Sequence, residues 1–256
     1  MLDLIIKNGT IIDGTNKPNF KLDIGIKNNI IQEIGILDDI PAKKIIDASN
    51  LVVAPGFIDI HTHSDISVIN DPYNESKIFQ GVTTEVTGNC SYSPFPSGND
   101  DPNTLKEELW EKRGNADDPN TIWKWTTFEE YANYIENRGT SLNIAPQVGY
   151  AALQIASGSV ENRRATVGEL ENMKKLANES IEQGAFSLST GLSVPPSAFA
   201  STEEIIEVCK SISHYDNVFY VTHAREGAGR HISKIEEAVE IGLKSNISVQ
   251  FSHLAI

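Results

Sequence analysis

The N-terminal part of the chain alternates short apolar runs with turn residues. The runs are "LDLIIKNGTIIDG" at 2–14, "LDIGIKNNIIQEIG" at 22–35 and "KKIIDASNLVVAPG" at 43–56. Short runs rich in Ile, Val and Thr that are bounded by Gly and Asn are typical of strands joined by tight turns. We therefore expect residues 1–55 to form a small β domain.

Beyond this segment, short apolar runs alternate with stretches of helical periodicity. Strands are predicted at 57–63, 82–89, 142–149, 184–191, 217–224 and 248–255. The clearest helices are predicted at 166–184, 201–215 and 229–246, each with a capping Ser or Thr or a Gly-rich lead-in. Such alternation over residues 56–256 indicates parallel β/α units and an α/β fold class.

The segment from Phe95 to Trp125 interrupts the second β/α unit. It is rich in Pro, Asn, Asp and Gly around one short charged helix, "TLKEELWEKRG" at 104–114. An insertion of this kind can be a substrate lid or a tolerated surface loop, and the pattern leaves both readings open.

Composition narrows the class of protein. The net charge of -14 argues against nucleic-acid binding, which relies on clustered Lys and Arg. The start, "MLDLIIKNGT", has neither a basic region nor a long apolar run, so we expect no signal peptide and no membrane span. Two cysteines cannot build a disulfide framework, and a cytoplasmic protein fits best.

Two histidines one residue apart end the first strand of the β/α region, in "FIDIHTHSD". On an extended chain His61 and His63 point to the same side. Taken by itself, a His-x-His pair is more readily explained as an ordinary polar strand end than as a metal site. Three more potential donors end other predicted strands, however: Cys90, His223 and His253.

The carboxyl ends of the strands of a (β/α) barrel surround a single mouth. We therefore expect these five side chains to converge there. Imidazole nitrogens and a thiolate are ligands that Zn²⁺ prefers. The sequence thus predicts a mononuclear or dinuclear zinc site.

The other histidines and the other cysteine serve as internal comparisons. Cys209 shares an apolar helical stripe with Ile205 and Ile212, so we expect it in the core. His214 lies near the end of that helix, and His231 opens another helix and is expected to be solvated. None of the three is a candidate ligand.

Five stretches together resemble the N-acyl-D-amino-acid deacylase (D-aminoacylase) branch of the amidohydrolase superfamily: "PGFIDIHTHSD", "QGVTTEVTGNC", "STGLSVPPSAFASTEEIIEVC", "THAREG" and "VQFSHLA". The resemblance implies a composite β-sandwich flanking a (β/α)8 TIM-type barrel with zinc at its mouth. It also implies that Cys90, His223 and His253 hold the main zinc, while His61 and His63 belong to a second, weakly occupied position.

Three positions differ from the pattern of this branch. Val194 replaces the usual Tyr before the Pro pair, "AREG" replaces a Met-Arg-Asp-Glu run, and Ala255 replaces a Lys two residues past the last histidine. In the branch, that Tyr and Lys are associated with the carboxylate of the substrate. The differences therefore bear on substrate specificity and leave the expected metal ligands in place.

A general base is also required for amide hydrolysis. Asp59, Asp65 and Glu85 are weak candidates, because each has a simpler reading as a packing, capping or second-sphere residue. In the related branch the base is an aspartate after the eighth strand, which we expect beyond residue 256. With about six strands, the barrel is expected to be truncated; the alternative is a shorter chain that closes by dimerising.

The expected function is that of a zinc-dependent amidohydrolase that cleaves the linear N-acyl bond of an N-acyl amino acid, expected to be an N-acyl-D-amino acid. Its partner is a small-molecule amide, with a homo-oligomer as a further option. Two alternatives stay open at this point: a cyclic-amide hydrolase of the dihydroorotase or hydantoinase type, and a non-catalytic metal-binding or interaction fragment.

Overall fold

A computed structural model describes residues 1–98, 101–111, 122–225 and 231–254. The chain divides into two compact units, Met1–Phe57 and Ile58–Ile256. Each unit is described separately below.

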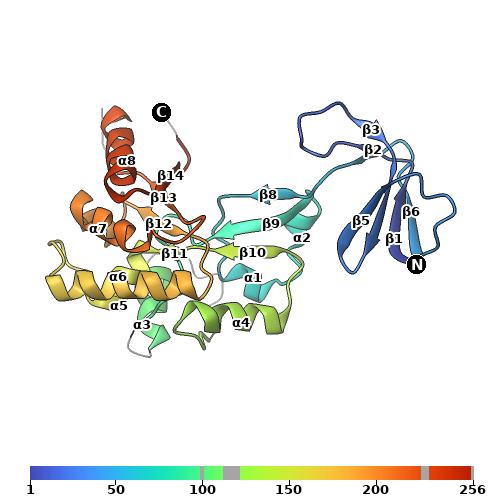
Figure 1. Cartoon of the computed structure of the whole chain (residues 1–256). Coiled ribbons are helices and arrows are strands. Elements are labelled where there is room, and N and C mark those ends of the chain that lie inside the picture. Colours follow the sequence, from blue (N-terminus) through green and yellow to red (C-terminus); the bar gives the residue numbers. More distant parts are fainter. Residues whose placement is uncertain (99–100, 112–121, 226–230, 255–256) are drawn as a thin grey trace. The chain divides into compact units, whose positions relative to one another are not determined.

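The first unit is made of strands, as the alternating pattern predicts, arranged in two sheets (Figure 1). The strands are β1 (Leu2–Lys7), β2 (Thr10–Ile11), β3 (Phe20–Lys21), β4 (Asp23–Lys27), β5 (Ile30–Gly35), β6 (Ala42–Asp47) and β7 (Val52–Val53). One sheet has the order β5-β4-β1-β6 and the other β3-β2-β7. The first sheet is mixed, because β1 pairs antiparallel with β4 and parallel with β6.

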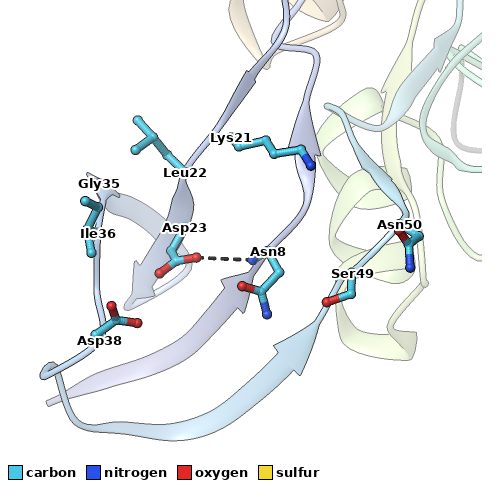
Figure 2. A pocket seen from close by; sticks show the side chains of 9 residues that line it. All are labelled: Asn8, Lys21, Leu22, Asp23, Gly35, Ile36, Asp38, Ser49 and Asn50. Atoms are coloured by element: carbon cyan, nitrogen blue, oxygen red, sulfur yellow. Dashed lines mark hydrogen bonds between the residues drawn. The ribbon is translucent and has the colours of Figure 1, made fainter.

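Few side chains are buried in this unit. Its apolar cluster comprises Leu2, Ile5 and Leu37. Beside it, the Asp23 carboxylate accepts hydrogen bonds from the backbone N–H groups of Asn8 and Leu37, at 3.2 and 3.1 Å. Figure 2 shows Asp23 and Asn8 in the shallow polar pocket that they line. These bonds join the turn after β1 to the end of β5, and the face-to-face packing of a sandwich stays a prediction.

The second unit contains the predicted parallel strands in chain order. They are β8 (Phe57–Asp59), β9 (Val82–Thr87), β10 (Asn143–Pro146), β11 (Val148–Gly149), β12 (Leu188–Gly191), β13 (Phe219–His223) and β14 (Ser248–Phe251). The sheets are β10-β9-β8 and β11-β12-β13-β14. The pairs β9–β10, β11–β12, β12–β13 and β13–β14 all run parallel.

The third predicted strand is divided into β10 and β11 at Gln147. The backbone N–H of Gln147 donates to Thr87 on one side, and that of Val148 donates to Ser187 on the other, at 3.0 and 2.9 Å. The first part of this strand, β10, therefore pairs with β9, and its second part, β11, pairs with β12. The two sheets are thus connected in strand order through this divided strand.

Helices follow the strands of this unit (Figure 1). They are α1 (Ser67–Asn70), α2 (Glu75–Ile78), α3 (Pro102–Lys106), α4 (Phe128–Arg138), α5 (Tyr150–Ser157), α6 (Val167–Glu182), α7 (Thr202–Ile212) and α8 (His231–Ser245), with a π-helix, η1 (Glu107–Glu111), and a 3₁₀ turn, η2 (Ser197–Phe199). Capping boxes start α4, α6 and α7. The helices predicted at 166–184, 201–215 and 229–246 correspond to α6, α7 and α8. In the described part of the chain, no helix is long and apolar enough to cross a bilayer.

The described part of the 95–125 segment is packed against the core. The short helix predicted at 104–114 is present over its described residues, as α3 and the π-helix η1, which follow one another without a break. Trp110, Trp123 and Trp125 are buried, and Trp110 contacts Trp123 with ring centroids 5.1 Å apart. The remaining part of the segment lies outside the described residues, so its role as a lid stays a prediction.

Candidate metal centre

All five predicted donors lie together at the carboxyl ends of the parallel strands. The Cys90 sulfur is at their centre, 3.4 Å from His61 Nε2. It also lies 3.6 Å from His223 Nδ1 and 3.6 Å from His253 Nε2. Segments separated by up to 163 residues therefore bring their nitrogen and sulfur atoms to one point.

Most of these side chains lie in the segments that follow the strands, and not at the strand ends where the sequence had predicted them. Only His223 belongs to a strand, as the last residue of β13. β8 ends at Asp59, so His61 and His63 follow it, and β9 ends three residues before Cys90. The expectation that the histidine pair lies on an extended strand was therefore wrong, although both rings still reach the cluster.

The distances fit a zinc ion. Zn–S bonds of about 2.3 Å and Zn–N bonds of about 2.0–2.1 Å at a tetrahedral angle place sulfur and nitrogen about 3.6 Å apart. The three distances from Cys90 are 3.4, 3.6 and 3.6 Å. The donor types and their separations thus suit this ion.

Two groups of three donors share Cys90. One comprises Cys90, His223 and His253, and the other Cys90, His61 and His63; within each group the ligand atoms lie within 4.8 Å of one another. In the second group, His61 Nδ1 is buried and has no hydrogen-bond partner among the described residues. This arrangement offers two adjacent positions joined by one sulfur.

Left-handed backbone conformations shape the turn that carries Cys90. Gly88, Cys90 and Ser91 have φ angles of 74°, 53° and 73°. Two glycines on neighbouring strands make room for it: a Cβ on Gly149 would lie 2.1 Å from the Ser91 carbonyl oxygen, and one on Gly191 would lie 2.4 Å from the Cys90 carbonyl oxygen. The sequence identified the cysteine but not the two glycines. Their role depends on how closely the turn packs against them, which only the structure shows.

Hydrogen bonds hold the same turn in place. The Ser91 hydroxyl accepts from the backbone N–H of Gly191 at 2.6 Å, and the Ser91 N–H donates to the Ser189 hydroxyl at 3.2 Å. The Asn89 side chain donates to the Val86 carbonyl at 2.9 Å and accepts from the Gln147 amide at 3.0 Å. All of these side chains are buried, so the position of Cys90 is strongly determined by its surroundings.

Burial sets the protonation of the donors. It lowers the pKa of His61 to about 4, with further lowering by His63, His253 and His223. Burial likewise lowers the pKa of His63. Burial raises the pKa of the Cys90 thiol to about 12. Neutral imidazoles are ready to bind a cation, and a cation would favour the thiolate form of Cys90.

Two of the three carboxylates considered as bases, Asp59 and Glu85, are paired with Lys77. Lys77 lies 2.8 Å from an Asp59 oxygen and 2.9 Å from a Glu85 oxygen, and Glu85 is fully buried. Asp59 also accepts a hydrogen bond from the backbone N–H of His61 at 3.3 Å. Asp65 is buried, and desolvation raises the pKa of its carboxyl to about 7. The two donor groups in the described part of the chain contain no carboxylate.

The comparison residues behave as expected where the structure describes them. Cys209 is fully buried in the main apolar cluster, and burial raises its pKa. His214 is exposed and lies against Tyr215, with ring centroids 4.0 Å apart. The side chain of His231 lies outside the described residues.

Known proteins of one family match this chain. Residues 44–182 match the amidohydrolase family. The D-aminoacylase of Alcaligenes xylosoxydans xylosoxydans is 38% identical over 251 residues, which are 98% of this chain and 50% of that protein. The chain therefore spans about half the length of this relative.

Two solved structures agree with it closely. A D-aminoacylase described by its binuclear metal centre, with one-metal activation and second-metal attenuation, superposes with a TM-score of 0.86 at 35% identity, over 97% of this chain and 51% of that one. The N-acyl-D-glutamate deacylase of Bordetella bronchiseptica, solved with zinc and a phosphonate inhibitor, gives 0.85 at 30% identity, over 97% and 50%. The resemblance to the D-aminoacylase branch is thereby confirmed, and the chain belongs to the amidohydrolase family.

Proposed function

We propose that this chain carries the metal centre of a zinc-dependent amidohydrolase that cleaves the linear N-acyl bond of an N-acyl-D-amino acid. The observation that carries the proposal is the position of Cys90, with its sulfur 3.4–3.6 Å from one nitrogen of each of three histidines. A buried thiol whose sulfur lies at such separations from three imidazole nitrogens, close to those around a tetrahedral zinc ion, is difficult to explain by packing alone.

The relatives support the choice of metal and bond. One is a D-aminoacylase with a binuclear metal centre, and another was solved with zinc and a mimic of the tetrahedral intermediate of its reaction. Because the chain spans about half of each, the activity of the whole protein is inferred from them. Cys90, His223 and His253 would hold the main zinc, and His61 and His63 would contribute to a second, weaker position.

Each group of residues has a separate task in this proposal. A zinc ion, when bound, lowers the pKa of water and polarises the amide carbonyl. The turn at Cys90 and the ends of β13 and β14 hold the donor atoms in place. Lys77 neutralises Asp59 and Glu85, which leaves neither free to accept the proton of an attacking water. Asp65 is buried and belongs to neither donor group, so we expect the general base to be a carboxylate beyond residue 256.

A non-catalytic metal-binding protein is the second candidate. It is favoured by one observation, the lack of a carboxylate in either donor group of the described residues. This candidate predicts bound zinc without hydrolysis, even when the chain is joined to a C-terminal half such as that of the D-aminoacylase relative.

We also expect a reducing, cytoplasmic environment, which would keep the Cys90 thiol available as a ligand.

Metal content tests the proposed site. The purified 256-residue chain should bind zinc, and Cys90→Ala should lose most of it because the charged ligand shared by both positions is removed. Cys209→Ala is the matched control; it removes the other buried thiol, should retain the metal, and should lower stability by about 1 kcal/mol or somewhat more. Equal zinc content in the two variants would contradict the assignment.

Substrate class needs a separate assay. With a complete barrel, N-acetyl-D-amino acids should be hydrolysed, and N-acetyl-L-amino acids, hydantoin and dihydroorotate should not. Hydrolysis of the cyclic amides alone would show that the enzyme cleaves a cyclic amide and not a linear N-acyl bond. The proposed metal site would be unaffected by that result.

A further inference from the structure

We propose that Ser193 and Arg225 are positioning residues for the metal ligand His223. In this proposal the Ser193 hydroxyl holds the imidazole in the tautomer and orientation that direct Nδ1 toward the metal. Arg225 in turn holds the loop that carries Ser193. The inference rests on the metal site proposed above and assigns to it two residues that are not ligands.

The first step concerns the two nitrogens of the His223 ring. Nδ1 lies 3.6 Å from the Cys90 sulfur, whereas Nε2 lies 2.6 Å from the Ser193 hydroxyl oxygen. A nitrogen that binds a metal cannot carry a proton, so Nε2 must carry it and donate to Ser193. A ring rotated away from this orientation would lose both interactions, and the serine therefore selects the productive one.

The second step concerns the loop that holds Ser193. The loop runs from Leu192 to Ala200, between β12 and α7, and its first residue donates its backbone N–H to the His223 carbonyl at 2.9 Å. At its far end, the Arg225 guanidinium donates to two carbonyl oxygens, Ala198 at 2.8 Å and Ala200 at 2.8 Å. Both ends of the loop are thus attached to the chain segment that contains His223.

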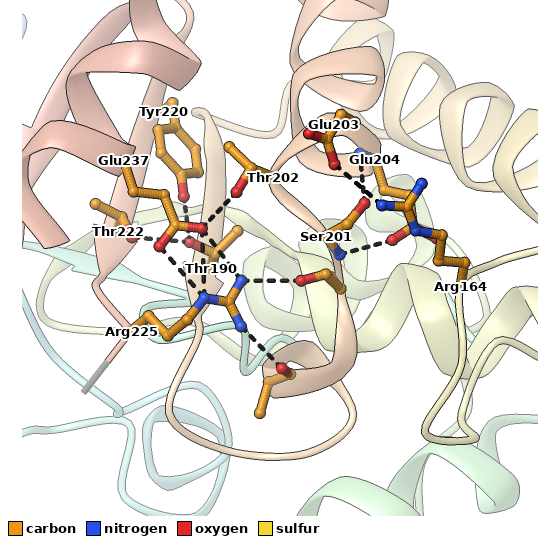
Figure 3. Close-up of polar contacts among 12 residues, drawn as sticks. Arg164, Thr190, Ser201, Thr202, Glu203, Glu204, Tyr220, Thr222, Arg225 and Glu237 are labelled. Carbon is orange, nitrogen blue, oxygen red and sulfur yellow. Dashed lines mark hydrogen bonds and ion pairs between the residues drawn. The ribbon is translucent and has the colours of Figure 1, made fainter. Parts of the chain in front are cut away.

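The third step concerns the charge of Arg225. Figure 3 shows the Glu237 carboxylate from α8 facing the guanidinium, with contacts of 3.2–3.3 Å. Thr202 at the start of α7 donates to the same carboxylate at 2.9 Å. Both charged side chains are largely buried, so the pair is held in one geometry rather than sampling many.

These contacts form a closed ring. His223 bonds to Ser193, the loop leads from Ser193 to Ala198 and Ala200, and their carbonyls bond to Arg225, which is two residues past His223. A ring of this kind fixes the ligand from both sides. Outer partners of metal-bound histidines typically affect metal affinity by about 10- to 100-fold when they are removed.

The test measures zinc affinity of the full chain by competition with a chromophoric chelator. Ser193→Ala should weaken zinc binding by about 10-fold or more, and Ser193→Thr, which keeps a hydroxyl, should recover most of it. The visible spectrum of bound Co²⁺ should change in Ser193→Ala, because the ligand field depends on the orientation of the imidazole. Far-UV circular dichroism should be unchanged, which excludes simple unfolding.

Arg225→Gln should weaken zinc binding in the same direction. Its control is Arg163→Gln, which removes an arginine that pairs with Glu169 at the start of α6 and makes none of the contacts of the ring. The effects of Arg225→Gln and Ser193→Ala should be less than additive in the double variant, since one residue acts through the other.

Three results would overturn the inference. They are a Ser193→Ala variant with unchanged affinity and Co²⁺ spectrum, equal effects of Arg225→Gln and Arg163→Gln, and full additivity in the double variant. If instead the unsubstituted chain bound no zinc, the proposed function itself would fail, so the two failures are distinguishable.

Discussion

At the residue scale, the metal centre consists of five donor side chains from separate segments of the chain, all close to the Cys90 sulfur. His61, His63, Cys90, His223 and His253 each follow or end a predicted strand, and the structure places all five together. Histidine and cysteine are scarce in this sequence, so these donors could be identified from it, whereas Ser193 could not. Serine is common, and its contact with His223 crosses 30 residues that carry no recognisable spacing. Metal ligands of scarce residue types can be recognised in a sequence. A common residue that holds such a ligand in place, like Ser193, can be recognised only when the fold is known.

The close approach of Gly191 to the cysteine turn gives a prediction at this scale. In Gly191→Ala the new Cβ would lie 2.4 Å from the Cys90 carbonyl oxygen, a backbone atom that can move only with the turn. We expect the variant to fold but to bind zinc more weakly, by about 10-fold or more, because small errors in ligand position degrade a metal site. Zinc titration of the purified variant measures this.

Gly168→Ala is the control for that variant. A Cβ on Gly168 in α6 would meet no atom within 4 Å. We expect unchanged zinc affinity and a small gain in stability, at most about 0.5–1 kcal/mol, because Gly168 lies in the first turn of the helix. Equal zinc affinity in the two glycine variants would show that the turn tolerates displacement.

At the element scale, the pattern of apolar residues predicted the six strands of the second unit and the helices α6, α7 and α8, but it missed α4, which is as long as α7. It placed strand ends too late, because β8 stops at Asp59 and β9 at Thr87. It also missed the division of the third strand at Gln147. Both differences arise from tertiary contacts: the residues after each strand turn toward the donor cluster, and Gln147 bridges two neighbouring strands.

The capping box of α6 gives a prediction about stability. The Thr166 hydroxyl accepts from the Glu169 N–H, and the Glu169 carboxylate accepts from the Thr166 N–H. Thr166→Ala should lower the free energy of unfolding by about 1 kcal/mol. Val167→Ala, at an exposed neighbouring position, should change it far less. Urea denaturation of both variants provides the comparison, and equal midpoints would rule out a stabilising cap.

The same box predicts a dependence on pH. Hydrogen bonds from Arg163, followed by that from Thr166, lower the pKa of Glu169 from 4.5 to about 2. A depressed pKa stabilises the fold above the unfolded value and loses this effect as pH falls through the folded value. The stability difference between the unsubstituted chain and Glu169→Gln should therefore be full above about pH 4.5. It should shrink toward pH 2, and a difference that instead grew in acid would contradict this linkage.

At the scale of the whole molecule, the two units differ in how much apolar surface they bury. The second unit has an extensive buried core, whereas the first has a small apolar cluster of Leu2, Ile5 and Leu37, with Ile11, Ile24 and Ala48 buried beside other residues. The alternating pattern could predict the strands of the first unit. It could not predict that isoleucines of these strands, such as Ile31 and Ile34, are exposed, because exposure depends on which strands and sheets lie beside them.

An apolar stripe on α8 predicts association of the 256-residue chain. Ile232, Ile235, Val239 and Leu243 recur at helical spacing, and Ile232 and Leu243 are 71% and 80% exposed. Contiguous apolar surface of this kind favours contact between molecules. We expect light scattering to show that the unsubstituted chain forms particles larger than a single chain. The double variant Ile232→Lys/Leu243→Glu should form smaller particles.

Val167→Glu is the control for the stripe. Val167 on α6 is 82% exposed but is not part of the stripe, so its replacement should leave association unchanged. A monodisperse monomer of the unsubstituted chain, or equal particle sizes for the stripe and control variants, would show that α8 does not drive association.

The central claim is that Cys90 and its neighbouring histidines form a zinc centre with the Cys90 sulfur as a ligand. X-ray absorption at the zinc edge of the loaded 256-residue chain tests it most directly, because sulfur and nitrogen ligands differ in distance and scattering. We predict one sulfur at about 2.3 Å together with nitrogen ligands at about 2.0–2.1 Å, and loss of the sulfur shell in Cys90→Ala. A first shell of nitrogen and oxygen alone in the unsubstituted chain would contradict the account.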